Sequence, residues 1–277
     1  MAGKLYLVAP PIGNLEDITI RALNVLKNVD LIAAEDTRHT LGLLNHFEIS
    51  KPLISYYKEI EKGKSEVLIK KLMDGQNIAV VSDAGTPGIS DPGEEIVKAA
   101  IENNIEIIPI PGACAFVNAL IASGMNTREF AFIGFLSANN KERREKLEEL
   151  IYENRTLIFY EAPHKLKAML ESLKEVLGDR KVVLARELTK LHEEFLRGNV
   201  STLLEQIVDK KGEFVVIVEG NNKSKKDINT ESLNEQSLEE HYNYYEKQGL
   251  DKKEIIKQIA KDRKTNKNEI YQYFLNK

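Results

Sequence analysis

Short apolar runs alternate with amphipathic stretches over the first half of the chain. The apolar runs predict strands at Lys4–Ala9, Asp30–Ala34, Pro52–Tyr56, Asn77–Val81 and Ile105–Ile110. The stretches between and after them place apolar residues on one helical face. They predict helices at Ile18–Lys27, Thr37–Phe47, Lys58–Asp74, Glu94–Asn103 and Ala115–Ser123, with Asp17 or Thr19 capping the first and Thr37 capping the second. Strands that alternate with helices in this way indicate a parallel α/β layer.

The pattern changes after the fifth helix. Further strands are predicted at Glu129–Phe135, Arg155–Tyr160, Lys181–Ala185, Glu193–Arg197 and Gly212–Glu219, with helices at Ala138–Tyr152, Pro163–Leu177 and Val200–Val208. We interpret this part as a second α/β domain with a mixed sheet. Residues 221–232 contain almost no apolar side chain and read as a linker. The predicted organisation is therefore an α/β domain over 1–125, a second over 126–220, the linker, and a small helical extension over 233–277.

Four of the predicted strands in the first half end in unusual loops. The longest, Val81–Gly93, reads V-S-D-A-G-T-P-G-I-S-D-P-G. Ordinary strand-to-helix loops are roughly 2–6 residues long, and open α/β sheets bind ligands at the carboxyl ends of their strands. The composition therefore favours a binding loop over the alternative of a well-ordered turn. The other three loops are Ala9–Leu15, Glu35–Arg38 and Pro111–Ala115.

Composition narrows the class of protein. A hydrophobic fraction of 42% over 277 residues is typical of a soluble globular protein. No apolar run approaches the ~18 residues of a membrane span, and the amino terminus lacks the pattern of a signal peptide. Cys114 is the only cysteine, so no intrachain disulfide or thiolate zinc cluster is expected, and a cytoplasmic location fits.

The charge is uneven along the chain. The formal net charge of −4 gives no overall signature of a nucleic-acid binder. Lys247–Lys277, however, holds 9 Lys and Arg against 4 Asp and Glu, an excess of 5, and its neighbourhood is rich in tyrosine. The last two predicted helices, Lys252–Lys261 and Asn266–Leu275, resemble a helix-turn-helix. Two interpretations stay open: a helical cap whose aromatic residues form a core, and a region that contacts RNA.

Several common chemistries lack their motifs. The chain contains no G-x-G-x-x-G after the first strand, no G-x-x-x-x-G-K-[ST], no H-E-x-x-H and no G-x-S-x-G. A Rossmann dinucleotide site, a P-loop, metal chemistry and an esterase nucleophile are therefore not expected. The strand-end loops instead offer backbone N–H and C=O groups to a polar ligand.

The ordered motifs carry a resemblance. They are A-P-P-I-G-N-L-E-D-I-T, A-E-D-T-R-H-T, V-S-D-A-G-T-P-G-I-S-D-P-G, P-G-A-C-A, F-Y-E-A-P-H-K-L, A-R-E-L-T-K and the strand start at Gly212 and Glu213. Over roughly Leu5–Gly220 the chain resembles the ribosomal RNA small subunit methyltransferase I family. That family belongs to the tetrapyrrole-methylase-like methyltransferases, which use S-adenosylmethionine (SAM). The resemblance implies methylation of a cytidine ribose 2′-hydroxyl in the decoding region of small-subunit (16S) ribosomal RNA.

The resemblance also implies an architecture and a cofactor site. It implies two α/β domains with SAM in the cleft between them, and a homodimer that acts on the RNA or the small (30S) ribosomal subunit. Carried over residue by residue, it implies SAM contacts from Pro11, Ser82, Asp83, Ala84, Gly85, Ile89, Ser90, Pro111, Gly112, Ala115, Phe159, Tyr160, Ala185, Arg186, Gly212 and Glu213.

A base would help the 2′-hydroxyl lose its proton. The hypothesis drawn from position is that Glu35 or Asp36 acts as this base or orients the ribose, while Arg38 holds a phosphate. The alternative is an ion pair that only fixes the loop. Glu161 and His164 form a second candidate pair, for which a helix cap is the simpler interpretation.

The chain departs from the family pattern at two places. Pro10 stands where the family usually has threonine, and Ala113 and Cys114 stand where it tends to have proline and serine. Pro10 lacks both the threonine hydroxyl and a backbone N–H, so a contact through either group would be lost. At Ala113 and Cys114 a contact made through the backbone would survive, whereas one made through a hydroxyl would not. Two other functions remain: a SAM methyltransferase of a tetrapyrrole or other small substrate, and a non-catalytic RNA binder that uses only the basic helices.

Overall fold

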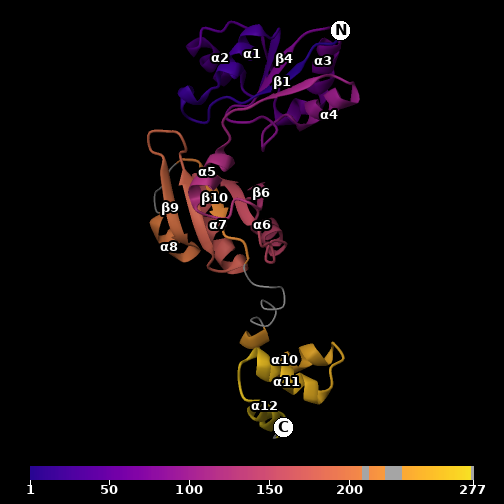
Figure 1. The fold of residues 1–277 in the computed structure, drawn as a ribbon, viewed down its shortest axis with the longest axis vertical. Coiled ribbons are helices and arrows are strands. Elements are labelled where there is room, and N and C mark those ends of the chain that lie inside the picture. Colours follow the sequence, from indigo (N-terminus) through magenta and orange to yellow (C-terminus); the bar gives the residue numbers. More distant parts are fainter. Residues whose placement is uncertain (208–211, 222–232, 276–277) are drawn as a thin grey trace. The chain divides into compact units, whose positions relative to one another are not determined.

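The computed structural model describes residues 1–207, 212–221 and 233–275 (Figure 1). The chain divides into two compact units. The first comprises residues 1–148 and 155–219, and the second comprises residues 149–154 and 220–277. Apart from its first residue, the predicted linker 221–232 lies outside the described residues.

A parallel sheet forms the start of the first unit. Its strands are β1 (Leu5–Val8), β2 (Leu31–Ala34), β3 (Leu53–Ser55), β4 (Ile78–Val81) and β5 (Ile107–Ile110). They lie in the order β3-β2-β4-β1-β5, and every neighbouring pair is parallel. The predicted parallel α/β layer is confirmed.

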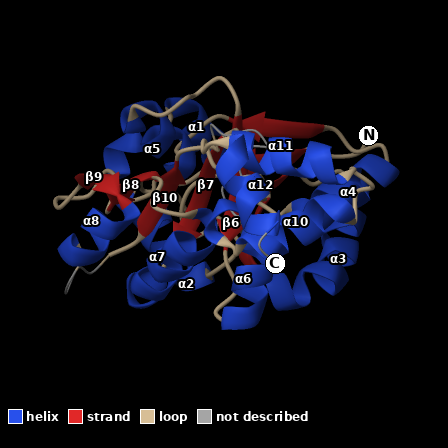
Figure 2. Cartoon of the chain, turned by 90° about the horizontal axis from the view of Figure 1, so that it is seen from below, coloured by secondary structure: helices blue, strands red, loops and turns tan. Residues whose placement is uncertain are grey.

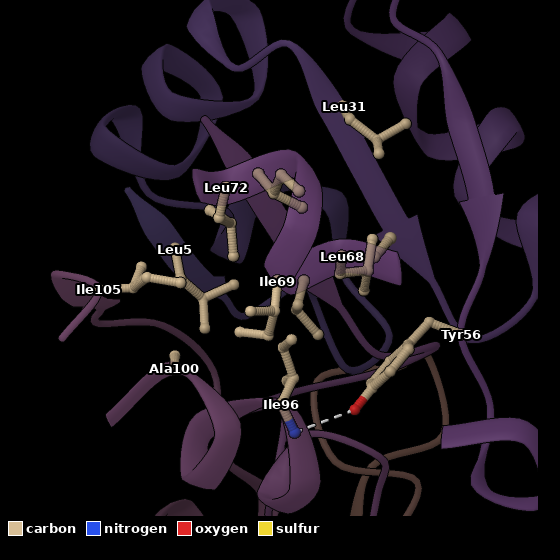
Figure 3. Packing of buried hydrophobic residues seen from close by; sticks show 12 residues of the cluster. Leu5, Leu31, Tyr56, Leu68, Ile69, Leu72, Ile96, Ala100 and Ile105 are labelled. Atoms are coloured by element: carbon tan, nitrogen blue, oxygen red, sulfur yellow. Dashed lines mark hydrogen bonds between the residues drawn. The ribbon is translucent and has the colours of Figure 1, made fainter. Parts of the chain in front are cut away.

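Helices cover both faces of this first sheet. One face packs against α1 (Ile20–Asn28) and α2 (Thr37–His46) through side chains such as Leu26 and Leu44. The other packs against α3 (Glu61–Met73) and α4 (Glu94–Glu102), where Leu68, Leu72 and Ile96 meet strand residues in the core of Figure 3.

The predicted N-cap is confirmed for α1 and is wrong for α2. Thr19 caps α1 by accepting a hydrogen bond from the Ala22 amide. The cap of α2 is Asp36 rather than the predicted Thr37, which is the first helical residue. The Asp36 carboxylate takes the cap because it accepts the hydrogen bond from the Arg38 amide directly.

The connections that leave β1 and β4 run toward opposite edges of the sheet. From β1 the chain crosses by way of α1 to β2 on one side, and from β4 it crosses by way of α4 to β5 on the other. These two neighbouring strands therefore send their connections to opposite faces. Open α/β sheets bind ligands outside the carboxyl ends of the strands at such a point.

A mixed sheet forms the rest of the first unit. Its strands are β6 (Phe130–Phe135), β7 (Thr156–Glu161), β8 (Lys181–Arg186), β9 (Glu194–Asn199) and β10 (Phe214–Val218), in the order β6-β7-β10-β8-β9. Only β6 and β7 pair in parallel, and the other pairs are antiparallel. The predicted mixed sheet is confirmed.

Helices also cover the mixed sheet. Figure 2 shows α5 (Ala115–Ser123) on one side of β7, β8 and β10, and α7 (Pro163–Leu177) on the other. The remaining helices of this part are α6 (Asn140–Glu148) and α8 (Val200–Gln206). Ala119 and Leu120 of α5 pack into the same core cluster as strand residues such as Ile158 and Ile217. The last helix of the predicted first domain thus shares its core with the second sheet.

The second unit contains the predicted helical extension. In its described part lie α10 (Leu238–Glu246), α11 (Lys252–Asp262) and α12 (Lys267–Leu275). Reciprocal capping boxes begin α10, at Ser237 and Glu240, and α11, at Asp251 and Glu254. None of the helices in the described parts of the chain has the length and apolar composition that a membrane crossing needs.

Candidate active site

The loop after β4 is joined to the loops on either side of it. The Gly85 amide donates a hydrogen bond to the Pro10 carbonyl in the loop after β1, at 3.1 Å. The Thr86 hydroxyl donates to the Ala113 carbonyl in the loop after β5, also at 3.1 Å. Within the loop, the buried Ser82 hydroxyl donates to the Gly85 carbonyl at 2.8 Å. These hydrogen bonds therefore join the loops that follow β1, β4 and β5.

A buried carboxylate fixes the far end of the same loop. Glu61 Oε1 accepts hydrogen bonds from the Tyr56 hydroxyl at 2.9 Å, the Gly93 amide at 2.8 Å and the Glu95 amide at 3.2 Å. The Ile96 amide donates to the Tyr56 hydroxyl in turn, as the dashed line in Figure 3 shows. Glu61 therefore satisfies free amides at the start of α4, where a negative charge also suits the helix dipole.

A cavity of about 440 Å³ opens beside these loops in the first unit. The parallel sheet supplies loop residues to its wall: Ile12, Glu35, Asp83, Ala84, Gly85, Thr86, Ile89, Ser90, Asp91, Cys114 and Ala115. The mixed sheet supplies residues at or near strand ends: Phe135, Tyr160, Glu161, Ala162, Ala185, Glu187, Leu188, Lys190, Glu213, Phe214 and Val215.

The cavity gathers part of the predicted cofactor set. The predicted residues that line it are Asp83, Ala84, Gly85, Ile89, Ser90, Ala115, Tyr160, Ala185 and Glu213, and Glu35 of the catalytic hypothesis lies there too. Tyr160 is fixed because its hydroxyl accepts a hydrogen bond from the Phe116 amide at 3.2 Å. This bond ties the start of α5 to the end of β7.

The other predicted cofactor residues do not line the cavity. They are Pro11, Ser82, Pro111, Gly112, Phe159, Arg186 and Gly212. Phe159 is fully buried, and Arg186 pairs with Glu194 at 3.3 Å rather than with the neighbouring Glu187. Gly112 lies so close to the loop after β1 that an added Cβ would be 2.7 Å from the Cβ of Ala9. Phe159 and Gly112 therefore pack against neighbouring parts of the protein and do not line the cavity.

The two departures from the family pattern have backbone roles. Pro10 is buried and contributes its carbonyl, which accepts the bond from Gly85. Ala113 likewise contributes the carbonyl that accepts from Thr86. Cys114 lines the cavity, and burial raises the pKa of its thiol. The backbone contacts thus remain with the residues that this chain carries.

Carboxylates dominate the charge of the cavity. Those that line it are Glu35, Asp83, Asp91, Glu161, Glu187 and Glu213, whereas Lys190 is the one Lys or Arg among the described lining residues. Glu35 and Asp83 each accept a hydrogen bond from the loop of the other. The Asp83 amide donates to the Glu35 carboxylate and the Asp36 amide donates to the Asp83 carboxylate, both at 3.0 Å. This exchange locks the end of β2 to the end of β4.

Burial and mutual repulsion perturb several of these acids. Burial raises the pKa of Glu35 and of Glu161. Burial, together with the charges of Glu35, Asp83 and Glu213, raises the pKa of Asp91 to about 7. The cavity therefore favours a positively charged ligand, which would relieve this repulsion.

The mixed sheet contributes a small ion-pair network to the wall. Glu187 accepts hydrogen bonds from Lys190 Nζ at 2.9 Å and from the Glu213 amide at 3.1 Å. Burial alone would raise the pKa of Glu187, but these bonds lower it. Lys190 Nζ also lies 3.5 Å from a carboxylate oxygen of Glu213. Glu187 and Thr189 both adopt positive φ, at 50° and 67°, so this turn is tightly constrained.

Asp36 and Arg38 lie outside the cavity wall. Arg38 Nη2 is 2.7 Å from Asp36 Oδ2, and the Arg38 side chain is 89% exposed. The hydrogen bonds from Arg38 lower the pKa of Asp36 to about 2. A carboxylate of such low basicity is a weak acceptor for a substrate proton. Glu161, of the second candidate pair, lines the cavity and accepts from the Ala162 amide at 2.9 Å, whereas His164 does not line it.

Sequence reasoning left several lining residues out of the cofactor set. From the loops these are Ile12, Thr86, Asp91 and Cys114, and from the mixed sheet they are Phe135, Glu161, Ala162, Glu187, Leu188, Lys190, Phe214 and Val215. The loop residues sit inside motifs that were already recognised, so their position was a usable signal. The described residues contain no group of three or more His, Cys, Asp or Glu arranged to hold a metal ion.

The chain matches one protein family over most of its length. Residues 4–204 match the family described as Tetrapyrrole (Corrin/Porphyrin) Methylases. The chain is 48% identical over 276 residues to the ribosomal RNA small subunit methyltransferase I of Synechocystis sp., covering 99% of this chain and 98% of that protein. It is 46% identical over 274 residues to the protein of the same name from Bacillus subtilis, covering 97% and 93%.

Solved structures share the fold at low identity. A uroporphyrin-III-C-methyltransferase from Thermus thermophilus matches with a TM-score of 0.57 and 22% identity, over 78% of this chain and 94% of that one. A structure of the Thermus enzyme complexed with S-adenosyl homocysteine matches with a TM-score of 0.56 and 15% identity, over 78% and 97%. At this level of identity the likeness establishes the architecture of the two sheets.

Proposed function

Because the chain belongs to the tetrapyrrole methylase family and, within it, to the ribosomal RNA small subunit methyltransferase I group, we propose that it methylates small-subunit ribosomal RNA. The methyl donor is SAM, and the acceptor is the ribose 2′-hydroxyl of a cytidine in the decoding region. The observation that carries the proposal is the acidic cavity beside the three joined strand-end loops.

The lining of the cavity suits SAM in three respects. Ala84 and Gly85 lie in the wall, where their small size lets a ligand approach the backbone closely. Apolar side chains such as Ile12, Leu188 and Val215 offer surface to an adenine ring. The excess of carboxylates suits a sulfonium charge. When bound, SAM supplies a methyl group activated by that charge. All of the predicted SAM contacts stay predictions, whether or not the residue lines the cavity.

The protein's part in the reaction is positioning. Loops fixed to one another and to the mixed sheet hold the reacting groups in line, and such alignment can contribute ~7–11 kcal/mol to lowering a barrier. Glu35 lies in the cavity wall and is held by the Asp83 amide, so we assign it to orienting the ribose. The exposed Arg38, steadied by Asp36, is assigned to a phosphate of the RNA.

The second unit offers a separate surface for RNA. Its core takes in Tyr242, Tyr244, Tyr245 and Phe274, whereas Tyr271 and Tyr273 are exposed. Exposed lysines accompany them at 252, 253, 257, 261, 264 and 267. Some aromatic residues therefore form a core, as expected of a helical cap, and others are exposed, as expected of a region that contacts RNA. Lysines near exposed tyrosines suit phosphate contact and base stacking, so we propose that this unit contacts RNA.

The assembly and location are also proposals. We infer a homodimer, in keeping with the exposed apolar side chains Val117 and Ile121, one turn apart on α5. The partner is the small ribosomal subunit or its RNA, and the location is the cytoplasm.

Transfer of labelled methyl from SAM tests the proposal. The full chain is incubated with small ribosomal subunits or with naked small-subunit RNA, and each product is digested to nucleosides. We expect label in 2′-O-methylcytidine, and comparison of the two substrates identifies the form recognised. Arg38→Ala should weaken RNA binding and leave SAM affinity unchanged. Bound SAM with no label in either RNA would overturn the proposal and point to a small-molecule acceptor.

A further inference from the structure

Asp91 differs from the other acids of the cavity. Each of the other five holds a partner. Glu35, Asp83 and Glu161 accept backbone amides, Glu187 accepts from Lys190 and the Glu213 amide, and Glu213 pairs with Lys190. Asp91 lines the cavity and is partly buried, but it makes no hydrogen bond or ion pair with any residue that the structure describes. A carboxylate in the wall with its lone pairs free is available to a substrate.

The backbone on both sides of Asp91 is fixed in uncommon conformations. Ser90 has φ of 70° and Gly93 has φ of 150°, although a non-glycine residue disfavours a positive φ by roughly 1–2 kcal/mol. The Gly88 amide donates to the Pro92 carbonyl at 3.2 Å, and the Gly93 amide is held by buried Glu61. The short segment that carries Asp91 is therefore held in place, and a positive φ at a non-glycine residue such as Ser90 is a kind of strain that clusters at functional sites.

We propose that Asp91 is the general base of the reaction, a role that rests on the proposed function. Its carboxylate takes the proton of the acceptor hydroxyl while an oxygen lone pair forms the new bond to the methyl carbon. The carbon–sulfur bond breaks with its electrons left on sulfur, which becomes neutral. Asp91 then returns its proton to solvent. Glu35 keeps a positioning role because its carboxylate already holds the Asp83 amide.

The surroundings of Asp91 suit this role. Its pKa of about 7, raised by burial and by Glu35, Asp83 and Glu213, lies near neutral pH, where a general base is most effective. The other titratable groups of the wall are Cys114, Tyr160, Glu161, Glu187 and Lys190. A bound cation stabilises the carboxylate and lowers the pKa of Asp91, so the base form is enriched in the complex that reacts.

The first test compares pH–rate profiles of wild type, Asp91→Asn and Glu35→Gln. For wild type, we expect kcat/KM for SAM to rise with pH to a plateau above a pKa near 7, because only the carboxylate form accepts the proton. Asp91→Asn should lower kcat by ~10²–10⁴-fold and abolish this rise. Glu35→Gln should lower activity and keep the rise, shifted to lower pH because the Glu35 charge no longer raises the pKa of Asp91. Glu102→Gln, at the exposed end of α4, should match wild type.

A second readout needs no turnover. SAM binding without RNA is measured calorimetrically at pH 7 in buffers of different ionisation enthalpy. Because a group with a pKa of about 7 is half protonated there, wild type should release up to about half a proton on binding. The SAM affinity of Asp91→Asn should lie within a few fold of the wild-type value, and its binding of SAM should not release this fraction of a proton. Glu35→Gln should still release a proton fraction, although a smaller one, because loss of the Glu35 charge lowers the pKa of Asp91.

The outcomes separate this assignment from the proposed function. Transfer by Asp91→Asn within threefold of wild type, or a pH rise that persists in it, would overturn Asp91 as the base. Loss of SAM binding in Asp91→Asn would also overturn it, since the residue would then serve to hold the donor. Wild type that binds SAM but methylates neither RNA would overturn the proposed function itself, and with it the assignment.

Discussion

The two sheets build one cavity in different ways. The parallel sheet contributes loops that follow its strands, and these loops are tied together through backbone groups such as Gly85 N–H and Pro10 C=O. The mixed sheet contributes residues on the strands or directly beside them, such as Tyr160 on β7 and Val215 on β10. Its antiparallel pairing places the start of β10 beside the ends of β7 and β8.

This difference separates two ways of fixing a site. On the parallel side, a loop keeps its shape only through anchors such as Glu61 and close contacts such as that of Gly112 with Ala9. On the mixed side, the strand ladder already fixes the backbone, and polar side chains complete the wall. Changes on the parallel side should therefore disturb stability and binding together, whereas changes on the mixed side should act more on binding.

The largest effect is expected from Glu61→Ala. It leaves the buried amide of Gly93, the partly buried amide of Glu95 and the hydroxyl of Tyr56 without their acceptor, which should cost about 3 kcal/mol in the free energy of unfolding. SAM affinity should fall as well, because the loop loses its anchor. Denaturant unfolding and calorimetry measure the two effects. Glu66→Ala, exposed on the same helix, should change the unfolding free energy by less than about 0.5 kcal/mol. Equal stability of the two variants would contradict the anchoring role.

Gly112→Ala should come next. The new Cβ would lie 2.7 Å from Ala9 Cβ and 3.1 Å from the Ala9 carbonyl oxygen, so the loops after β5 and β1 must separate. Overpacking of this kind costs ~1–3 kcal/mol in stability. Gly42→Ala is the matched control, since its Cβ meets nothing within 4 Å in α2 and should be neutral or stabilising. An unchanged melting temperature and SAM affinity for Gly112→Ala would show that the loops do not need this contact.

On the mixed side, Gly212→Ala is paired with Gly178→Ala. Both glycines have positive φ, at 98° and 82°, so each substitution should cost ~1–3 kcal/mol in backbone strain. Only at position 212 would the Cβ meet the Glu187 side chain, at 2.4 Å, whereas position 178 is open. SAM affinity should therefore fall for Gly212→Ala alone. Equal SAM affinities of the two variants would show that the position of Glu187 does not affect SAM binding.

The smallest effect is expected in the second unit, away from both sheets. His241 is fully buried, and burial with the nearby Arg263 lowers its pKa below 6.5. The folded state therefore favours the neutral ring, so stability is fully present above pH 6.5 and is lost as pH falls below it, by at most ~1.4 kcal/mol per pH unit. Hydrogen exchange of α10 and α11 in the full chain measures this loss. It should disappear in His241→Gln and persist in His46→Gln, which alters an exposed ring.

Much of the fold was predictable because its signals are local. Apolar runs located the ten described strands of the two sheets to within a few residues, and Gly and Pro marked the loops that line the cavity. The sequence carried no signal where the arrangement depends on contacts between distant residues. The packing of α5 on the mixed sheet depends on residues such as Ile158 and Ile217, far along the chain from Leu120.

The residues of the candidate site also fall into those indicated by local sequence motifs and those brought there by distant contacts. Asp83, Gly85 and Tyr160, for which the resemblance implies SAM contacts, line the cavity, and the contacts themselves stay predictions. Glu187 and Lys190 were not expected there, because only antiparallel pairing brings β8 beside the start of β10. Asp91 stood in a recognised motif, but its lack of a partner among the described residues is a property of three-dimensional packing.

The acidic lining also gives the catalytic cycle a direction. Six carboxylates face one lysine in the wall, and they attract a ligand as long as it carries the sulfonium charge. Once the methyl group has left, the demethylated ligand has one positive charge fewer, and the same carboxylates hold it less tightly. Under the proposed function, the carboxylates that attract the donor therefore hold the demethylated product less tightly, and we expect weak inhibition by product.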